Sequence, residues 1–174
     1  MGTGSLNLKG RLWVLQREGR LICDIDTDMI YHNAHLAVTD VSKMGQFAFG
    51  NLKGFEDFAT LARPGDVVLA GDNFGSGSSR QHAVDCFKAL GVQAVIARSF
   101  GAIYKRNAIN SAFPVLEVPG LPEGAFAHLE EILADLEAGT VSGASGTVAG
   151  RPMSGVARDI FLAGGLFEFA RGGS

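Results

Sequence analysis

Two runs rich in apolar residues, at 66–70 and 91–98, are the clearest signal in the hydrophobic pattern of the chain. Short apolar runs bounded by turn residues are typical of strands that are buried on both faces. The segment between them, residues 79–90, repeats apolar side chains at helical spacing. The order strand, helix, strand predicts a parallel pair of strands with a right-handed crossover.

The rest of the pattern predicts further elements around this unit. Strands are expected at residues 6–15, 21–23 and 115–118, with a hairpin at 140–149. Helices are expected at residues 42–49, 55–61, 100–112, 126–138 and 157–162. The helix at 126–138 rests on apolar residues at helical spacing and a closing glycine: Leu129, Ile132, Leu133, Leu136 and Gly139.

These elements predict an α/β fold with a mixed, partly parallel sheet and flanking helices. The chain of 174 residues is long enough for a sizeable core, and we expect residues 1–174 to form one domain. Residues 1–5 are small and polar, and we expect them to be a frayed start or a remnant of cloning.

The predicted strand at 66–70 leads into the glycine loop, residues 71–81, which contains three glycines followed by Ser78, Ser79 and Arg80. A strand, a glycine-rich turn and a helix start direct backbone N–H groups and the helix dipole at one point. An anion is expected there, and a carboxylate held by both arms of Arg80 fits best. The alternative is a turn whose serine only caps the helix. The spacing excludes a Walker loop, a dinucleotide fingerprint and a hydrolase elbow.

Composition and charge narrow the function classes. Hydrophobic residues make up 47% of the chain and the net charge is −3, so neither disorder nor a nucleic-acid partner is expected. The chain has no basic cluster for a membrane surface and no apolar run of membrane-spanning length. We expect a cytoplasmic protein. Cys23 and Cys86 cannot supply the usual ligand set of an iron–sulfur cluster, so no metal or cofactor is expected on this chain.

Two polar groupings leave alternatives open. Three alternating aspartates between residues 24 and 28 either bond the local backbone or bind calcium, although the glycine and closing glutamate of an EF-hand are missing. Ser78, His82 and Asp85 lie on one predicted helix face, in the order of the nucleophile, base and orienting residue of a hydrolase triad. Side chains stacked along one helix do not form that relay well, so the triad is the weaker interpretation.

The segment D-N-F-G-S-G-S-S-R-Q-H-A, residues 72–83, resembles the signature of the aconitase superfamily's swivelling domain. More closely, it is similar to the separate small subunit of 3-isopropylmalate dehydratase and homoaconitase enzymes. Further matches to that family lie at D-I-D-T-D (24–28), S-F-G-A-I-Y (99–104), R-N-A-I-N (106–110) and A-G-G-L (163–166). The resemblance implies a swivelling β/β/α domain.

The resemblance also implies a reaction, the reversible loss and re-addition of water on a 2-hydroxy dicarboxylate. It makes Ser78 the catalytic base, with Asp28 positioning or polarising a neighbouring group such as that serine, while Ser79 and Arg80 bind the substrate. The required [4Fe-4S] cluster is expected on a large partner subunit, so that this chain is a hydro-lyase only within a hetero-oligomer.

Residues 31–40 bear on the choice of substrate within that family. Homoaconitase-like members carry an arginine here for an additional carboxylate, whereas this chain has Ala37 and Val38. An apolar wall favours an alkyl group, so 3-isopropylmalate and leucine biosynthesis are expected. Homocitrate or homoaconitate, 2,3-dimethylmalate and a non-catalytic anion-binding module remain alternatives. His35 and Gln81 depart from the family pattern; Gln81, in place of a glutamate, either leaves Arg80 freer for substrate or marks another subgroup.

Overall fold

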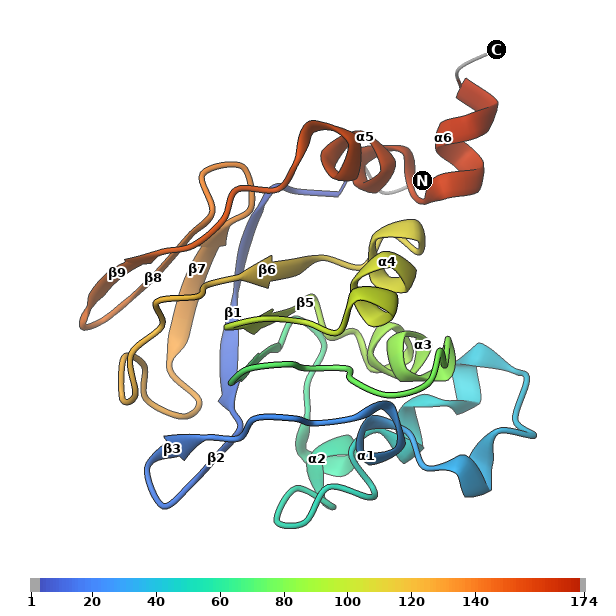
Figure 1. The fold of residues 1–174 in the computed structure, drawn as a ribbon, viewed down its shortest axis with the longest axis horizontal. Helices are drawn as coiled ribbons and strands as arrows, with labels where there is room; N and C mark the ends of the chain where they lie inside the picture. Colours follow the sequence, from blue (N-terminus) through green and yellow to red (C-terminus); the bar gives the residue numbers. More distant parts are fainter. Residues whose placement is uncertain (1–3, 173–174) are drawn as a thin grey trace.

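A seven-stranded mixed sheet is the centre of the structure, a computed structural model that describes residues 4–172 (Figure 1). Its strand order is β6-β5-β4-β1-β7-β8-β9, and a separate hairpin pairs β2 with β3. The strands are β1 (Asn7–Val14), β2 (Gln16–Arg17), β3 (Arg20–Leu21), β4 (Val67–Ala70), β5 (Ala94–Ala97), β6 (Val115–Glu117), β7 (Glu131–Asp135), β8 (Thr140–Gly143) and β9 (Gly146–Ala149).

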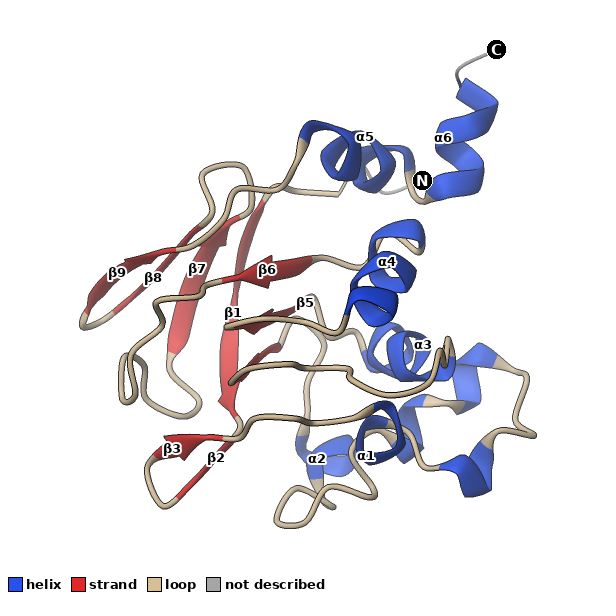
Figure 2. Ribbon diagram, in the orientation of Figure 1, coloured by secondary structure: helices blue, strands red, loops and turns tan. Residues whose placement is uncertain are grey.

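Six α-helices accompany the sheet in the described part of the chain: α1 (Thr27–Ile30), α2 (Phe58–Leu61), α3 (His82–Leu90), α4 (Ala102–Asn110), α5 (Gly155–Ala163) and α6 (Leu166–Gly172). Figure 2 shows the strands gathered on one side of the molecule and the helices on the other. Within residues 4–172, no helix combines the length and apolarity needed to cross a bilayer.

The parallel half of the sheet confirms the predicted strand, helix, strand unit. β1, β4, β5 and β6 run parallel, with Trp13 opposite Val68 and Val68 opposite Val95. α3 connects β4 to β5, and α4 connects β5 to β6. Every residue of β4 and β5 is buried, which explains their unbroken apolar sequences.

The antiparallel half corrects one prediction. The helix expected at residues 126–138 is wrong, because this segment contains strand β7, which pairs antiparallel with β1. Ile132 and Ala134 are buried, while Leu133 between them is 44% exposed. Pairing with β1 therefore favours a strand, in which side chains alternate between the two faces. The leucines at helical spacing had concealed this alternation in the sequence.

Several other elements begin or end at residues that differ from the predicted ones. α3 begins at His82 rather than at residue 79, so Ser78 and Ser79 belong to the preceding loop. The helix expected at 42–49 is two short 3-10 turns, Val41–Lys43 and Gly45–Phe47. The hairpin at 140–149 and the helix near 157–162 are confirmed, and α6 was not predicted. Of the expected frayed start, residues 1–3 lie outside the described residues, whereas the Ser5 hydroxyl donates to the Asn7 carbonyl at 2.8 Å.

Two hydrophobic cores lie on opposite faces of the parallel strands. Val68 and Val95 face a core shared with α3, whereas Leu69 and Ile96 face a core that includes Val141 of β8. The sheet curls enough for the segment after β9 to return to β6, where the Arg151 N–H donates to the Glu117 carbonyl at 2.8 Å. The central parallel strands β4 and β5 are thereby enclosed on both sides, and the loops at their carboxyl ends are open to solvent.

Candidate active site

The glycine loop lies beyond the carboxyl end of β4, between two other loops that carry polar motifs. The Gly75 N–H donates to the Ile25 carbonyl at 2.7 Å, and the Thr27 N–H donates to the Ser76 carbonyl at 2.9 Å. On the other side, the Phe74 N–H donates to the Ser99 carbonyl at 3.0 Å. Three segments that are far apart in the sequence therefore meet at one edge of the sheet, where open α/β sheets place their sites.

Two glycines are required by the path of this loop. Gly75 has φ +78°, and a Cβ at this position would overlap the ring of the buried Tyr104. Gly77, directly before Ser78, has φ +95°. Side chains other than glycine rarely adopt such φ values, so the loop reaches Ser78 only with glycine at these positions.

Ser78 is held by its backbone and presents an exposed side chain. Its carbonyl accepts a hydrogen bond of 3.0 Å from the Thr27 hydroxyl, and Thr27 is 3% exposed. Within residues 4–172, the Ser78 hydroxyl has no hydrogen-bond partner. The hydroxyl is thus available to a molecule that approaches the loop from solvent.

Arg80 is fixed by contacts to α1 and to the residue directly after it. Its Nη1 donates to Asp28 Oδ1 at 3.1 Å and to the Tyr31 carbonyl at 2.8 Å, and the arginine side chain is 12% exposed. Asp28 also accepts from the Asn33 N–H at 2.9 Å and from Asn51 Nδ2 at 3.1 Å. The Asn33 hydrogen bond, supported by the Arg80 guanidinium, lowers the pKa of Asp28 below its usual value. The carboxylate therefore stays ionised and orients Arg80; within the described residues it is hydrogen-bonded to this arginine and not to the Ser78 hydroxyl.

Ser79 and Gln81 are bonded to α4 and its C-terminal end. Ser79 Oγ accepts from Asn107 Nδ2 at 3.2 Å. Gln81 Nε2 donates to Asp85 Oδ1 at 3.1 Å and to Ser111 Oγ at 2.7 Å. A glutamate at position 81 would face the Asp85 carboxylate, which explains an amide here. The charge beside Arg80 is supplied by Asp28, so the side chain of residue 81 does not determine whether this arginine is paired.

The segment at 31–40 is pinned at its carbonyl groups. The Tyr31 hydroxyl donates to the His35 carbonyl at 2.9 Å, and burial raises the pKa of Tyr31, which keeps it a donor. His82 Nε2 lies 3.0 Å from the Val38 carbonyl, and since a carbonyl only accepts, Nε2 carries the proton. The His35 ring stacks on Phe47 at 3.9 Å. Ala37 is exposed and Val38 is half-buried.

These contacts answer the two alternatives raised by the polar groupings. His82 is bonded to residue 38 and Asp85 to Gln81, so the hydrolase triad with Ser78 is not assembled. Asp26 caps α1, with its side chain accepting from the Met29 N–H at 2.8 Å, as the local-backbone interpretation predicts.

The described part of the chain offers no ligand set for an iron–sulfur cluster. It contains no group of three or more histidine, cysteine or acidic side chains placed to hold a metal ion. Cys23 is exposed, while Cys86 is buried in α3 and burial raises its pKa, which disfavours the thiolate that a metal requires.

The loops therefore assemble an exposed hydroxyl, a fixed guanidinium and an ionised carboxylate on one open edge, an arrangement suited to a small anionic substrate. The sequence predicts Ser78, Ser79, Arg80 and Asp28 as site residues, and the structure places them in neighbouring segments. The sequence did not indicate the supporting contacts of Thr27, Tyr31, Asn51 and His82. Thr27 lies inside the D-I-D-T-D motif and could have been found there, whereas no pattern marks Asn51.

Comparisons with known proteins agree with one another. The family of the aconitase C-terminal domain matches residues 26–120. A 3-isopropylmalate dehydratase small subunit of Deinococcus deserti is 39% identical over 149 residues, covering 84% of this chain and 81% of that protein. One of Methanosarcina mazei is 34% identical over 169 residues, covering 94% and 96%. The crystal structure of 3-isopropylmalate dehydratase from Methanocaldococcus jannaschii superposes with a TM-score of 0.81 at 30% identity, covering 95% of this chain and 94% of that one.

Proposed function

Since this chain belongs to the aconitase C-terminal domain family and groups there with the 3-isopropylmalate dehydratase small subunits, we propose that it is one half of a two-chain hydro-lyase. In this proposal it isomerises 3-isopropylmalate and 2-isopropylmalate, a reaction of leucine biosynthesis, together with a large subunit. The observation that carries the proposal is the exposed Ser78 hydroxyl held on the same open edge as the oriented Arg80. A site shared between two chains must be open in each of them.

Ser78 is the proposed base that removes the proton from the carbon next to a substrate carboxylate. This proton is weakly acidic, so the serine must act as an alkoxide and its negative charge must be stabilised. One well-placed hydrogen-bond donor to such an oxyanion contributes about 3 kcal/mol. The glycine loop supports this role because it keeps the hydroxyl clear of competing partners within the described residues.

Arg80 and Ser79 are the proposed substrate-binding residues. The contacts of Arg80 to Asp28 and to the Tyr31 carbonyl both use Nη1, which leaves Nε and Nη2 to donate to a carboxylate. The Ser79 hydroxyl, held by Asn107, can donate to the same substrate. Asp28 acts as a positioning residue because it sets the direction of the guanidinium.

The iron–sulfur cluster of this reaction is assigned to the large subunit. The two cysteines of this chain lie in different environments, one exposed and one in the core, and do not fit a cluster. This chain therefore contributes the base and the carboxylate-binding residues.

Ala37 and Val38 are proposed to contact the alkyl group of the substrate. Neither side chain can pair with a carboxylate, and an unpaired buried carboxylate costs several kcal/mol, on the order of 3 or more. The isopropyl group of 3-isopropylmalate fits such a surface, whereas homocitrate would place a carboxylate there.

The test is an anaerobic hydratase assay with a cluster-loaded large subunit and four substrates: 3-isopropylmalate, 2,3-dimethylmalate, homocitrate and citrate. We expect the native chain to prefer 3-isopropylmalate. Ala37→Arg should lower kcat/KM for this substrate and raise the relative rate with homocitrate by about tenfold, since one added ion pair of modest strength has that effect. Ala34→Arg, an exposed residue of the same segment, is the matched control and should change neither rate.

Two outcomes would contradict the proposal in different ways. Preference for homocitrate by the native chain would retain the hydro-lyase and overturn the role of Ala37 and Val38. No turnover of any substrate, with a large subunit shown to bind and to hold its cluster, would favour a non-catalytic anion-binding module.

A further inference from the structure

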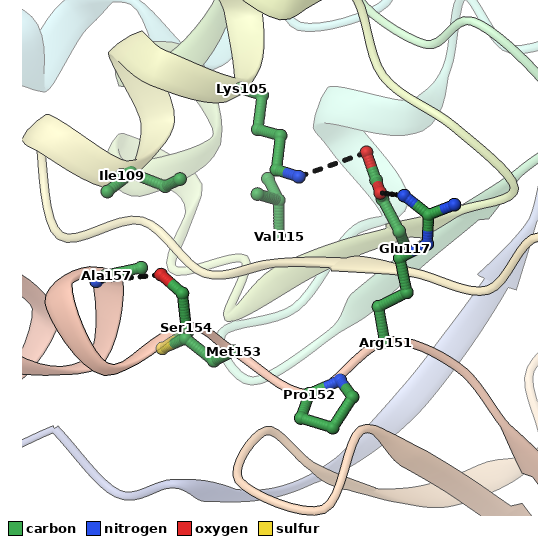
Figure 3. A pocket seen from close by; sticks show the side chains of 9 residues that line it. All are labelled: Lys105, Ile109, Val115, Glu117, Arg151, Pro152, Met153, Ser154 and Ala157. Carbon is green, nitrogen blue, oxygen red and sulfur yellow. Dashed lines mark hydrogen bonds and ion pairs between the residues drawn. The ribbon is translucent and has the colours of Figure 1, made fainter.

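A cavity of about 150 Å³ lies between α4, β6 and the start of α5 (Figure 3). Its floor is apolar and is formed by Ile109, Val115, Met153 and Ala157. The same four side chains border a smaller void that is lined further by Phe113 and Phe161. The cavity and the void therefore share one apolar wall.

The rim of this cavity carries two cations and one carboxylate. Lys105 Nζ lies 3.2 Å from Glu117 Oε1, and Arg151 Nη1 lies 3.2 Å from Glu117 Oε2 (Figure 3). Glu117 is 12% exposed, so its two oxygens hold both cations at the mouth. The three side chains sum to a charge of +1, and each cation retains N–H donors that Glu117 does not use. One further carboxylate would neutralise the rim.

The size and the lining together define the ligand class. A cavity of about 150 Å³ with an apolar lining accommodates a molecule the size of benzene. An inorganic anion would satisfy the rim but leave the floor without contacts, and a neutral alkane would do the reverse. A molecule with one carboxylate and a short branched alkyl group satisfies both.

We propose that this cavity binds a small aliphatic carboxylate, with its carboxylate between Lys105 and Arg151 and its alkyl group between Val115 and Ala157. The site is distinct from the glycine loop. Lys105 and Ile109 are four residues apart and face the cavity, while Asn107 between them bonds to Ser79 on the other face of α4. α4 therefore borders both sites.

Calorimetric titration of the full chain with sodium 3-methylbutanoate tests the proposal. This ligand has the required carboxylate and branched alkyl group, and a dissociation constant on the order of 1 mM is expected for so small a molecule. Formate lacks the alkyl group and 3-methylbutan-1-ol lacks the charge. Each should bind at least about tenfold more weakly. Because no large subunit is involved, the result is independent of the proposed hydro-lyase activity.

Two variants locate the binding. Arg151→Gln removes a rim cation whose side chain is 71% exposed, and should weaken 3-methylbutanoate binding about tenfold. Arg158→Gln is the matched control, because Arg158 pairs with Glu137 and does not line the cavity. Ala157→Leu fills the floor and should abolish binding, with thermal unfolding confirming that each variant is folded.

The proposal is overturned if 3-methylbutanoate shows no saturable binding. It is also overturned if formate binds equally well, which would indicate a rim that attracts any anion, or if Arg151→Gln and Arg158→Gln weaken binding to the same degree. If Ala157→Leu does not fold, Arg151→Gln decides the question alone.

Discussion

The parallel and antiparallel halves of the sheet share β1 but bury their strands differently. β4 and β5 are buried at every residue, whereas β7 alternates between buried and exposed side chains. A strand that is buried on both sides has no side chain left for a substrate. The polar groups of the parallel half are therefore concentrated in the loops at its strand ends, where Ser78, Arg80 and Asp28 meet.

The largest effect on the parallel half is expected at the glycine loop, from Gly75→Ala. The added Cβ would overlap the ring of the buried Tyr104, and the alanine would have to adopt φ +78°. We expect the free energy of unfolding to fall by more than about 4 kcal/mol, and activity with the large subunit to be lost. Urea unfolding measures the first effect.

Gly54→Ala is the control for backbone strain. Gly54 has φ +91°, but no heavy atom lies within 4 Å of the added Cβ. We expect a cost of only about 1 kcal/mol. Equal costs at the two positions would show that φ alone, and not the contact with Tyr104, requires glycine at position 75.

In the antiparallel half, Ile132→Ala and Leu133→Ala should differ in their effects, because a strand places these neighbours on opposite faces of the sheet. Ile132 is 2% exposed and Leu133 is 44% exposed. We expect Ile132→Ala to lower the free energy of unfolding by about 3 kcal/mol and Leu133→Ala by less than about 1 kcal/mol. Similar losses for both variants would contradict the register of β7 against β1.

Asp66, directly before β4, connects the parallel strand β4 to β1. Its carboxylate accepts hydrogen bonds from Arg11 and Trp13 of β1 and from the Arg63 N–H. Burial by itself raises the pKa of Asp66, but these hydrogen bonds outweigh it and hold the pKa below its usual value. Because the folded pKa is depressed, the ionised group stabilises the fold above the unfolded pKa of about 3.9, and this stabilisation is lost as the pH falls through the folded value.

Asp66→Asn should therefore lower the free energy of unfolding by about 2 kcal/mol at neutral pH. The difference from the native chain should stay constant between about pH 5 and 7 and shrink below about pH 4. Chemical unfolding at a series of pH values measures it. A difference that grows toward acid would contradict the depressed pKa.

The same contrast explains what could be predicted from the sequence. The apolar runs of β4 and β5 are unambiguous because both of their faces are buried, so the parallel unit and the glycine loop were located correctly. β7 was mistaken for a helix because its exposed Leu133 completes a helical spacing with Leu129 and Leu136. The strand is selected by its pairing with β8 in a hairpin and with β1, 120 or more residues away in the sequence.

The candidate site could likewise be predicted only in part. A conspicuous motif supplied the candidate residues, but their hydrogen-bond partners come from other segments and carry no local signal. Asp28 was expected to position a neighbouring group such as the serine, and the group that it contacts is Arg80, because the short helix at Thr27–Ile30 turns this carboxylate toward the guanidinium. Contacts of this kind depend on the tertiary path of the chain rather than on sequence spacing.

The proposed role of Ser78 as the base is tested most directly by the kcat of Ser78→Ala, measured with a saturating, cluster-loaded large subunit and 3-isopropylmalate. The side chain is exposed and has no hydrogen bond within the described residues, so the fold should be unaffected. Loss of the base should lower kcat by about 10²- to 10⁴-fold, whereas Ser79→Ala should act mainly on KM. If Ser78→Ala retains more than about a tenth of the native kcat, Ser78 is not the base of this reaction.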